Sequence, residues 1–161
     1  MSNLTTLETA PRFIADAMLG KLARWLRLLG YDTLYLQDDD ATIAQRARAE
    51  SRILLTRDHD LAARRGLRVI LIASQELESQ LVQVMREAGA LPSDTPPRCM
   101  TCNVPLQDIS PEEARESVPP YVAQTQHEFR RCPCCGRITW PATHWRGIQE
   151  RLNRVRGEAL K

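Results

Sequence analysis

The first part of the chain alternates between short apolar runs and longer segments whose apolar residues recur every three or four positions. The short runs, which are typical of buried strands, lie at residues 12–16, 33–36, 53–56 and 68–72. The longer segments predict amphipathic helices at residues 18–29, 40–50, 58–65 and 75–88. Strands that alternate with helices in this way predict an α/β fold, with a parallel sheet covered by helices on both faces.

Two of the helical segments show which face should be buried. In the first, the apolar stripe consists of Met18, Leu22, Trp25, Leu26 and Leu29. In a further segment at the end of the chain, the stripe consists of Trp145, Ile148, Leu152 and Val155, with Arg151, Arg154 and Arg156 outside it. This basic C-terminal helix either packs back on the first domain or contacts phosphates.

Aspartates follow three of the four predicted strands. Asp16 comes directly after the first strand, and residues 38–40, all aspartate, follow the second. Asp58 and Asp60 follow the third. The carboxyl ends of parallel strands share one edge of a sheet, where ligand crevices form. Carboxylates gathered there repel one another unless a cation is bound, and oxygen ligands favour Mg2+ or Mn2+.

Each of these acids also has a purely structural explanation. Asp40 and Asp58 are placed to cap helices, and residues 38–40 together suit a solvated loop. Glu50 lies in the last turn of a predicted helix, where the helix dipole disfavours an acid, and either reaches the site or faces solvent. Asp16 ends an apolar segment and is expected to cap no helix, so it gives the strongest support for a ligand site.

Four cysteines form two Cys-x2-Cys pairs, Cys99 with Cys102 and Cys132 with Cys135. Two such turns supply four thiolates for a tetrahedral Zn2+ site, which has no open position for catalysis. The residue after each pair is asparagine or glycine, and both readily adopt the left-handed conformation that such a turn needs. Cys134 has no partner at a matching spacing and is interpreted as a spare thiol. The 29 residues between the pairs indicate an inserted element.

Disulfide bonds are the alternative for these cysteines. Residues 1–20 contain no apolar stretch behind a basic start, so we expect a cytoplasmic location, where thiols stay reduced. The doubled Cys-x2-Cys spacing therefore favours zinc. We expect a first domain at residues 1–91, a proline-rich linker at residues 92–98, and a small metal-stapled domain with the basic helix at residues 99–161.

The charge of the chain is nearly balanced but unevenly distributed. The formal net charge is +2, yet residues 130–161 hold eight basic and two acidic side chains. Only Lys21 and Lys161 among the 22 basic residues are lysine, and guanidinium groups suit bidentate contact with phosphates. A GC-rich gene would give the same arginine excess without a functional cause. No run approaches the roughly 20 apolar residues that span a membrane.

Several motifs resemble one known family. They are FIADAMLGKLARWLR at residues 13–27, LGYD at 29–32, ILLTRD at 53–58, the CP and CGR motifs within 132–137, and the WP and THW motifs within 140–145. These motifs resemble the bacterial and archaeal proteins named after the C-terminal RNase region of the mutator-seven exonucleases. The resemblance implies a PIN-like nuclease domain followed by a zinc ribbon, acting as a metal-dependent endoribonuclease.

The resemblance also implies the catalytic residues. Asp16 matches the first acid of PIN-like domains, and Asp58 matches the acid after the third strand. The full set assigned to catalysis and to Mg2+ or Mn2+ binding is Asp16, Asp40, Asp58 and Asp60. Asp40 is assigned as the second acid, and Glu50 and Asp39 are its alternatives. One or two ions held there would activate water and offset charge on the phosphate.

RNA is the partner that this resemblance implies. The basic residues assigned to RNA contacts are Lys21, Arg24, Arg57, Arg131 and Arg137. Ordinary solvation of a helix surface is the alternative for the first three. Trp140 and Trp145 either stack on unpaired bases or cover the small domain. A noncatalytic RNA-binding or adaptor protein is the alternative function, and the sequence indicates neither a protein partner nor an oligomeric state.

Overall fold

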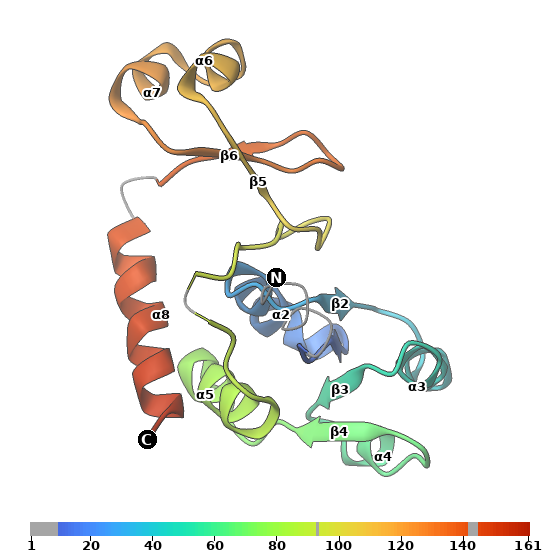
Figure 1. Ribbon diagram of the computed structural model, residues 1–161. Helices are drawn as coiled ribbons and strands as arrows, with labels where there is room; N and C mark the ends of the chain where they lie inside the picture. Colours follow the sequence, from blue (N-terminus) through green and yellow to red (C-terminus); the bar gives the residue numbers. More distant parts are fainter. Residues whose placement is uncertain (1–9, 93, 142–144) are drawn as a thin grey trace, which may run out of the picture.

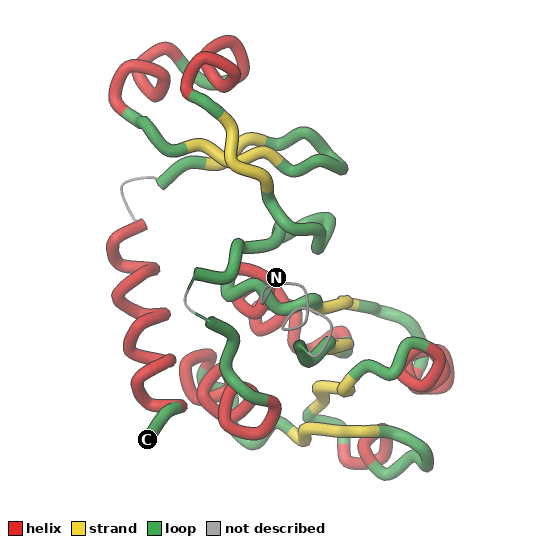
Figure 2. The backbone as a smooth tube through the Cα atoms, viewed as in Figure 1, coloured by secondary structure: helices red, strands yellow, loops and turns green. Residues whose placement is uncertain are grey.

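The chain folds into two sheets joined by a linker (Figures 1 and 2). The computed structural model describes residues 10–92, 94–141 and 145–161. A four-stranded parallel sheet with its helices forms the first unit, and a three-stranded antiparallel sheet forms most of the second. The final helix runs back from the second unit along the first (Figure 2). The prediction of an α/β fold with a parallel sheet is therefore confirmed.

The parallel sheet is built from short strands. In chain order they are β1 (Phe13–Ala15), β2 (Thr33–Tyr35), β3 (Ile53–Thr56) and β4 (Arg68–Leu71). Their order in space is β2-β1-β3-β4, so β1 and β3 lie in the centre and are buried along their whole length. Ala15 pairs in register with both Tyr35 and Leu55, which aligns the carboxyl ends of β1, β2 and β3 at one edge.

Helices cover both faces of this sheet. They are η1 (Ala17–Leu19), α2 (Gly20–Leu28), α3 (Asp40–Ala49), α4 (His59–Ala62) and α5 (Leu77–Ala88). Phe13 and Ala15 of β1 pack into the core that α2 and α5 cover, whereas Ile14 packs with α3 and α4 on the other face (Figure 1). Successive side chains of a strand point to opposite faces, so a fully apolar strand needs both layers.

One residue of the predicted stripe in the first helix lies outside the core. The α-helix begins at Gly20 rather than at residue 18, and Met18 lies in the preceding η1 with 76% of its surface exposed. Leu22 and Leu26 are buried as predicted. A 3-10 turn has three residues per turn, so it rotates Met18 away from the face that a continuous α-helix would give it.

The second unit is an antiparallel sheet with short helical segments. Its elements are β5 (Gln107–Ile109), α6 (Pro111–Ala114), η2 (Arg115–Ser117), α7 (Pro120–Thr125), β6 (Phe129–Arg131) and β7 (Ile138–Thr139). The strands lie in the order β5-β6-β7. A small core of Ala114, Val118, Val122 and Phe129 joins the helical segments to the sheet. These segments lie between the two cysteine pairs, so they are the inserted element that the long spacing predicted.

The last helix, α8 (Trp145–Ala159), packs on α5 and adds to the core of the first unit. The buried residues of its stripe are Leu152 and Val155. Arg151, which the pattern placed outside, instead covers the ring of Trp25 at 5.1 Å and pairs with Glu78 at 2.9 Å. A long guanidinium side chain can cover an indole while its charge meets an acid, which helical spacing does not reveal. No described helix is long and apolar enough to cross a membrane.

Candidate functional site

Asp16 and Asp58 leave the sheet side by side at the carboxyl edge, because β1 and β3 are neighbours. Asp16 accepts a hydrogen bond from the backbone N–H of Met18 at 3.1 Å and so caps η1. The expectation that it caps no helix was therefore wrong, because the pattern did not reveal this 3-10 turn. Asp58 accepts a hydrogen bond from the backbone N–H of Asp60 at 2.8 Å and caps α4, as predicted.

The side chain of Thr56 links the two aspartates. Its hydroxyl donates a hydrogen bond to Oδ2 of Asp16 and accepts one from the backbone N–H of Asp58 at 3.0 Å. Thr56 is completely buried, and Asp16 is only 7% exposed. The sequence pattern by itself assigns no role to this threonine. The available signal was a hydroxyl at the end of an otherwise apolar strand, directly before the acid-bearing loop.

Asp39 and Asp40 stand at the start of α3, on the same edge of the sheet. The chain reaches them from β2, the other neighbour of β1. The helix begins at Asp40, so Asp39 rather than the predicted Asp40 is its cap. The Asp39 carboxylate accepts a hydrogen bond from the backbone N–H of Thr42 at 3.1 Å, and the hydrogen bonds from Thr42 lower its pKa.

Glu50, an alternative for the second acid, lies at the opposite end of α3. It directly follows the last residue of the helix that Asp40 begins, and the ten residues of that helix span about 15 Å. Its carboxylate pairs with Arg46 and Arg52. Hydrogen bonds from Arg46 first, and then from Arg52, lower the pKa of Glu50. This acid belongs to the amino edge of the sheet, away from Asp16.

The aspartates share an edge without forming a closed cluster. Among the residues that the structure describes, only the four cysteines form a group of three or more potential ligands whose donor atoms all lie within 4.8 Å of one another. Asp58 and Asp60 are exposed, whereas Asp16 is buried. Mg2+ usually binds one or two carboxylates and completes its shell with water and phosphate oxygens. The arrangement suits that open mode of binding better than an all-protein cage.

Lys21, Arg24 and Arg57 lie close to this edge in the chain. Lys21 and Arg24 are exposed and one turn apart on α2, which begins four residues after Asp16. Arg57 is half-buried and lies between Thr56 and Asp58 in the sequence. None of the three forms an ion pair within the described ranges. Their positive charges therefore remain available to an anionic ligand.

The four paired cysteines converge on one point. Their sulfurs lie within 4.8 Å of one another, and the sulfurs of Cys99 and Cys135 are 4.0 Å apart. Tetrahedral coordination with metal–sulfur bonds of about 2.3 Å separates the sulfurs by about 3.8 Å. The cluster therefore fits one metal ion such as zinc, and its cysteines are free of disulfides. Cys134 is exposed and stands outside the group.

Backbone N–H groups stabilise the sulfur of Cys132. The N–H groups of Cys134 and Cys135 point at it, at 3.4 Å and 3.5 Å. Burial alone would raise the pKa of this thiol, but hydrogen bonds from the two backbone N–H groups, together with those from the thiols of Cys135 and Cys99, lower the pKa to about 7. Gly136 closes the turn with a φ of 76°, as predicted. The thiolate, which is the form that binds metal, is thereby favoured near neutral pH.

The first cysteine turn is attached to the parallel sheet through Asn103. This residue adopts the predicted left-handed conformation, with a φ of 64°. Its Oδ1 accepts a hydrogen bond from the backbone N–H of Thr33 at 2.9 Å, and its Nδ2 donates one to Asp32 at 2.7 Å. Asp32 also accepts a hydrogen bond from Arg52, which is buried, at 2.8 Å. The first cysteine turn is therefore held at the parallel sheet by specific hydrogen bonds.

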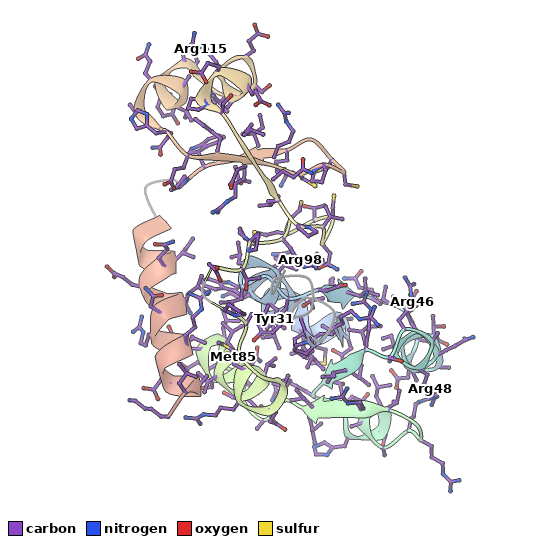
Figure 3. The ribbon with its side chains drawn as sticks, in the orientation of Figure 1. Tyr31, Arg46, Arg48, Met85, Arg98 and Arg115 are labelled. Atoms are coloured by element: carbon purple, nitrogen blue, oxygen red, sulfur yellow. The ribbon has the colours of Figure 1, made fainter. Side chains whose placement is uncertain are left out.

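Two further arginines strengthen this attachment. Arg27, near the end of α2, donates hydrogen bonds to the backbone carbonyls of Thr33 at 2.8 Å and of Met100. Arg98, in the expected linker, donates to the backbone carbonyls of Gly30 at 3.1 Å and Asn103 at 2.8 Å. Figure 3 shows Arg98 between the two units. The linker segment next to the cysteines is thus held in place by specific contacts.

The basic and aromatic residues proposed for the second unit are only partly engaged. Arg131 pairs with an acid of α6 at 3.8 Å, whereas Arg137 is exposed and forms no ion pair within the described ranges. Trp140 packs edge to face against Phe129, with ring centroids 6.4 Å apart, so it helps to cover the small core while its ring stays partly exposed. The side chain of Trp145 lies outside the part of the chain that the structure describes.

A family model described as the Mut7-C RNAse domain matches residues 11–152. Comparisons with curated proteins and with solved structures give no match. The matched range contains both sheets, the aspartate-bearing loops and the cysteine cluster, so it covers most of the chain and every site described above. The chain therefore belongs to the Mut7-C RNAse domain family.

Proposed function

We propose that this protein is a metal-dependent endoribonuclease whose catalytic ion binds to aspartates at the carboxyl edge of the parallel sheet. The observation that carries the proposal is the link from Asp16 through the Thr56 hydroxyl to the backbone of Asp58. This link connects the carboxylate of Asp16 with the backbone of Asp58 at the carboxyl edge of two adjacent strands. Membership of an RNase family supports RNA as the substrate.

The donor set at this edge fits a hard divalent cation. Each oxygen of Asp16 accepts one hydrogen bond, so each keeps a second lone pair for a ligand. Asp16 and Asp58 would hold the ion, and Asp40 and Asp60 complete the proposed acid set. A bound Mg2+ or Mn2+ would offset charge on the phosphodiester and activate water for its hydrolysis. The PIN-like assignment of the fold belongs to the same proposal.

The residues around the acids have separate roles in this account. Thr56 and the backbone N–H of Met18 fix the orientation of the Asp16 carboxylate, because each holds one of its oxygens. Lys21, Arg24 and Arg57 would bind phosphates on either side of the cleaved bond, since charge-assisted contacts with phosphate are strong and position the strand. Positioning of this kind supplies much of the catalysis in phosphate chemistry.

We assign zinc to the four-cysteine cluster, in a ribbon that has a structural role. A closed set of four thiolates leaves no open position for a substrate, so the ion would hold the second unit together. Arg131 and Arg137 would then extend the RNA-binding surface beyond the first unit. A cytoplasmic location, where thiols remain reduced, belongs to the same proposal.

One observation favours the alternative of a noncatalytic RNA-binding protein. Asp16, Asp39 and Asp58 all cap helical segments, so helix formation alone would account for an aspartate at each of these positions. A chain that kept these caps without catalysis would retain the same fold and the same basic surface. The two functions differ in whether the protein breaks phosphodiester bonds.

A circular single-stranded RNA separates these functions, because only an endonuclease can open it. We expect Mn2+-dependent linearisation by the unaltered chain and its loss in Asp16→Asn and Asp58→Asn. The matched control is Asp94→Asn, which changes an exposed aspartate outside the edge. If the unaltered, zinc-loaded chain binds the circular RNA but leaves it uncleaved, the noncatalytic alternative is established.

A further inference from the structure

A cavity of about 660 Å³ lies between the two units, on the side of α2 that faces the antiparallel sheet. Its walls come from α2, the linker, the first cysteine turn, the antiparallel sheet and α8. Its lining includes Trp25, Leu28, Arg98, Arg130, Arg137 and Trp140. A cavity of this size with a largely apolar lining and a few polar groups is typical of a site for a small organic group.

Two indole rings from different units line this cavity. Trp25 comes from α2 and Trp140 from the segment after β7, and both are half-buried. The guanidinium of Arg151 lies over Trp25 at 5.1 Å and covers one face of that ring, so only its other face could take a base. Trp140 meets Phe129 at an interplanar angle of 60°, so the two rings meet edge to face rather than stacked. Half-buried indoles offer flat surfaces on which another planar group can stack.

One guanidinium at the cavity is available to an anion. Arg130 pairs with Asp108 at 3.2 Å, and Arg98 donates both of its hydrogen bonds to backbone carbonyls. Arg137 has neither a side-chain hydrogen bond nor an ion pair in the part of the chain that the structure describes. The lining also contains Glu128, so the site is not uniformly positive. The cavity therefore offers an anion one unpaired guanidinium, that of Arg137, within the part of the chain that the structure describes.

One face of α2 connects the aspartate edge with the cavity. Lys21, Arg24, Trp25 and Leu28 occupy positions i, i+3, i+4 and i+7, which lie on the same side of a helix. The axial distance from the first to the last is about 10 Å. Lys21 lies in the first turn of α2, which follows Asp16 and η1, and the two apolar residues line the cavity. An extended strand bound at the aspartates can therefore reach the cavity along this helix.

We propose that the cavity binds an unpaired base of the RNA substrate. The indole rings of Trp25 and Trp140 are its stacking surfaces, and Arg137 binds an adjoining phosphate. Aromatic stacking is the usual way in which proteins hold unpaired bases, and it needs a base that is free of a duplex. This inference rests on the proposed function. It identifies a second place, apart from the cleaved bond, at which the protein holds the RNA substrate.

Binding of a labelled single-stranded RNA without added Mg2+ or Mn2+ tests the site, with one abasic nucleotide moved stepwise along the strand. We expect one position at which loss of the base weakens binding by about tenfold. Trp140→Leu should weaken binding of the intact strand to a similar extent and should remove the penalty at that position. Trp140→Phe keeps a stacking surface and should retain the penalty. Hybridisation with a complementary strand should abolish the positional effect.

Arg137→Gln provides a second test that leaves the apolar packing unchanged. It should weaken binding at all base sequences and reduce the dependence of binding on salt concentration. The matched control is Arg115→Gln, which alters an exposed arginine on the outer part of the second unit (Figure 3). This control should bind as the unaltered chain does.

The inference is wrong if the abasic penalty is the same in Trp140→Leu as in the unaltered chain, or if no position shows a penalty. Those results with normal opening of circular RNA would remove the cavity site and leave the proposed nuclease function intact. A penalty that depends on Trp140, found in a chain that cleaves no RNA, would support the base site and reject the nuclease function.

Discussion

Asn103 donates a hydrogen bond from Nδ2 to Oδ1 of Asp32 at 2.7 Å, across 71 residues of sequence. The contact joins the residue that completes the first cysteine turn to the loop between α2 and β2. Asp32 is held from the other side by Arg52, which is buried. Formation of the cysteine turn and formation of the sheet should therefore be energetically coupled.

Substitution of Asn103 by glycine separates its two roles. Glycine keeps the left-handed backbone that the turn needs, but it lacks the side chain that reaches Asp32 and Thr33. We expect Asn103→Gly to lower the free energy of unfolding by about 2 kcal/mol while the chain still binds one zinc ion. Urea denaturation and elemental analysis measure the two quantities. Stability equal to that of the unaltered chain would show that the contact does not couple the units.

The ionisation of Asp32 should make the stability of the fold depend on pH. Partial burial opposes ionisation of Asp32, but the hydrogen bonds from Arg52 and Asn103 outweigh it and lower the pKa below the ordinary value. The folded state therefore holds this proton less tightly than the unfolded state. The resulting stability is present above the unfolded pKa of about 4 and is lost as the pH falls through the folded pKa.

We therefore expect the difference in unfolding free energy between the unaltered chain and Asp32→Asn to be constant near neutral pH and to shrink below about pH 4. Denaturant titrations at a series of pH values measure it. Any acid release of zinc affects both chains and cancels in the difference. A difference that stays constant through the acid range would exclude ionisation of Asp32 as the cause.

Thr56 is expected to act on catalysis by positioning Asp16. Thr56→Val removes the hydroxyl at nearly constant volume, whereas Thr56→Ser keeps it. We expect Thr56→Val to lower kcat by about tenfold or more, as seen for groups that orient metal ligands, with RNA affinity little changed. Thr56→Ser should recover most of the rate. An equal loss in both variants would point to packing of the methyl group instead of the hydrogen bond to Asp16.

The adjacent residues Cys134 and Cys135 offer a matched pair for the metal site. Both are exposed, but only Cys135 belongs to the four-sulfur group. We expect Cys135→Ser to lose most of its zinc and the structure of the second unit, whose own core is small. Cys134→Ser should retain one zinc ion per chain. The measurements are elemental analysis and circular dichroism, and equal zinc contents in the two variants would contradict the assignment.

The parts of the fold that could be predicted from sequence are those with regular apolar spacing. The four strands and their helices were located to within a few residues, because each packs a continuous apolar face. Strands such as β5 and β7 carry no such pattern, because most of their residues are polar and exposed and they pair only with β6. Met18 was misplaced because a 3-10 turn interrupts the helical period.

The candidate site was predictable in its residue types and not in its connections. The aspartates stand at strand ends, which the alternation of elements already indicated. The role of Thr56 depends on the register between β1 and β3, and the role of Asp32 depends on a contact with the distant Asn103. Spacing along the chain contains no information about either, so both emerge only once the sheet and the cysteine turn are in place.

The claim that aspartates at the carboxyl edge hold the catalytic ion is tested most directly by anomalous diffraction from crystals soaked with Mn2+. We expect one Mn2+ site in contact with the carboxylates of Asp16 and Asp58, and its loss in crystals of Asp16→Asn. Mn2+ bound elsewhere, with no ion at this edge in an active protein, would contradict the account.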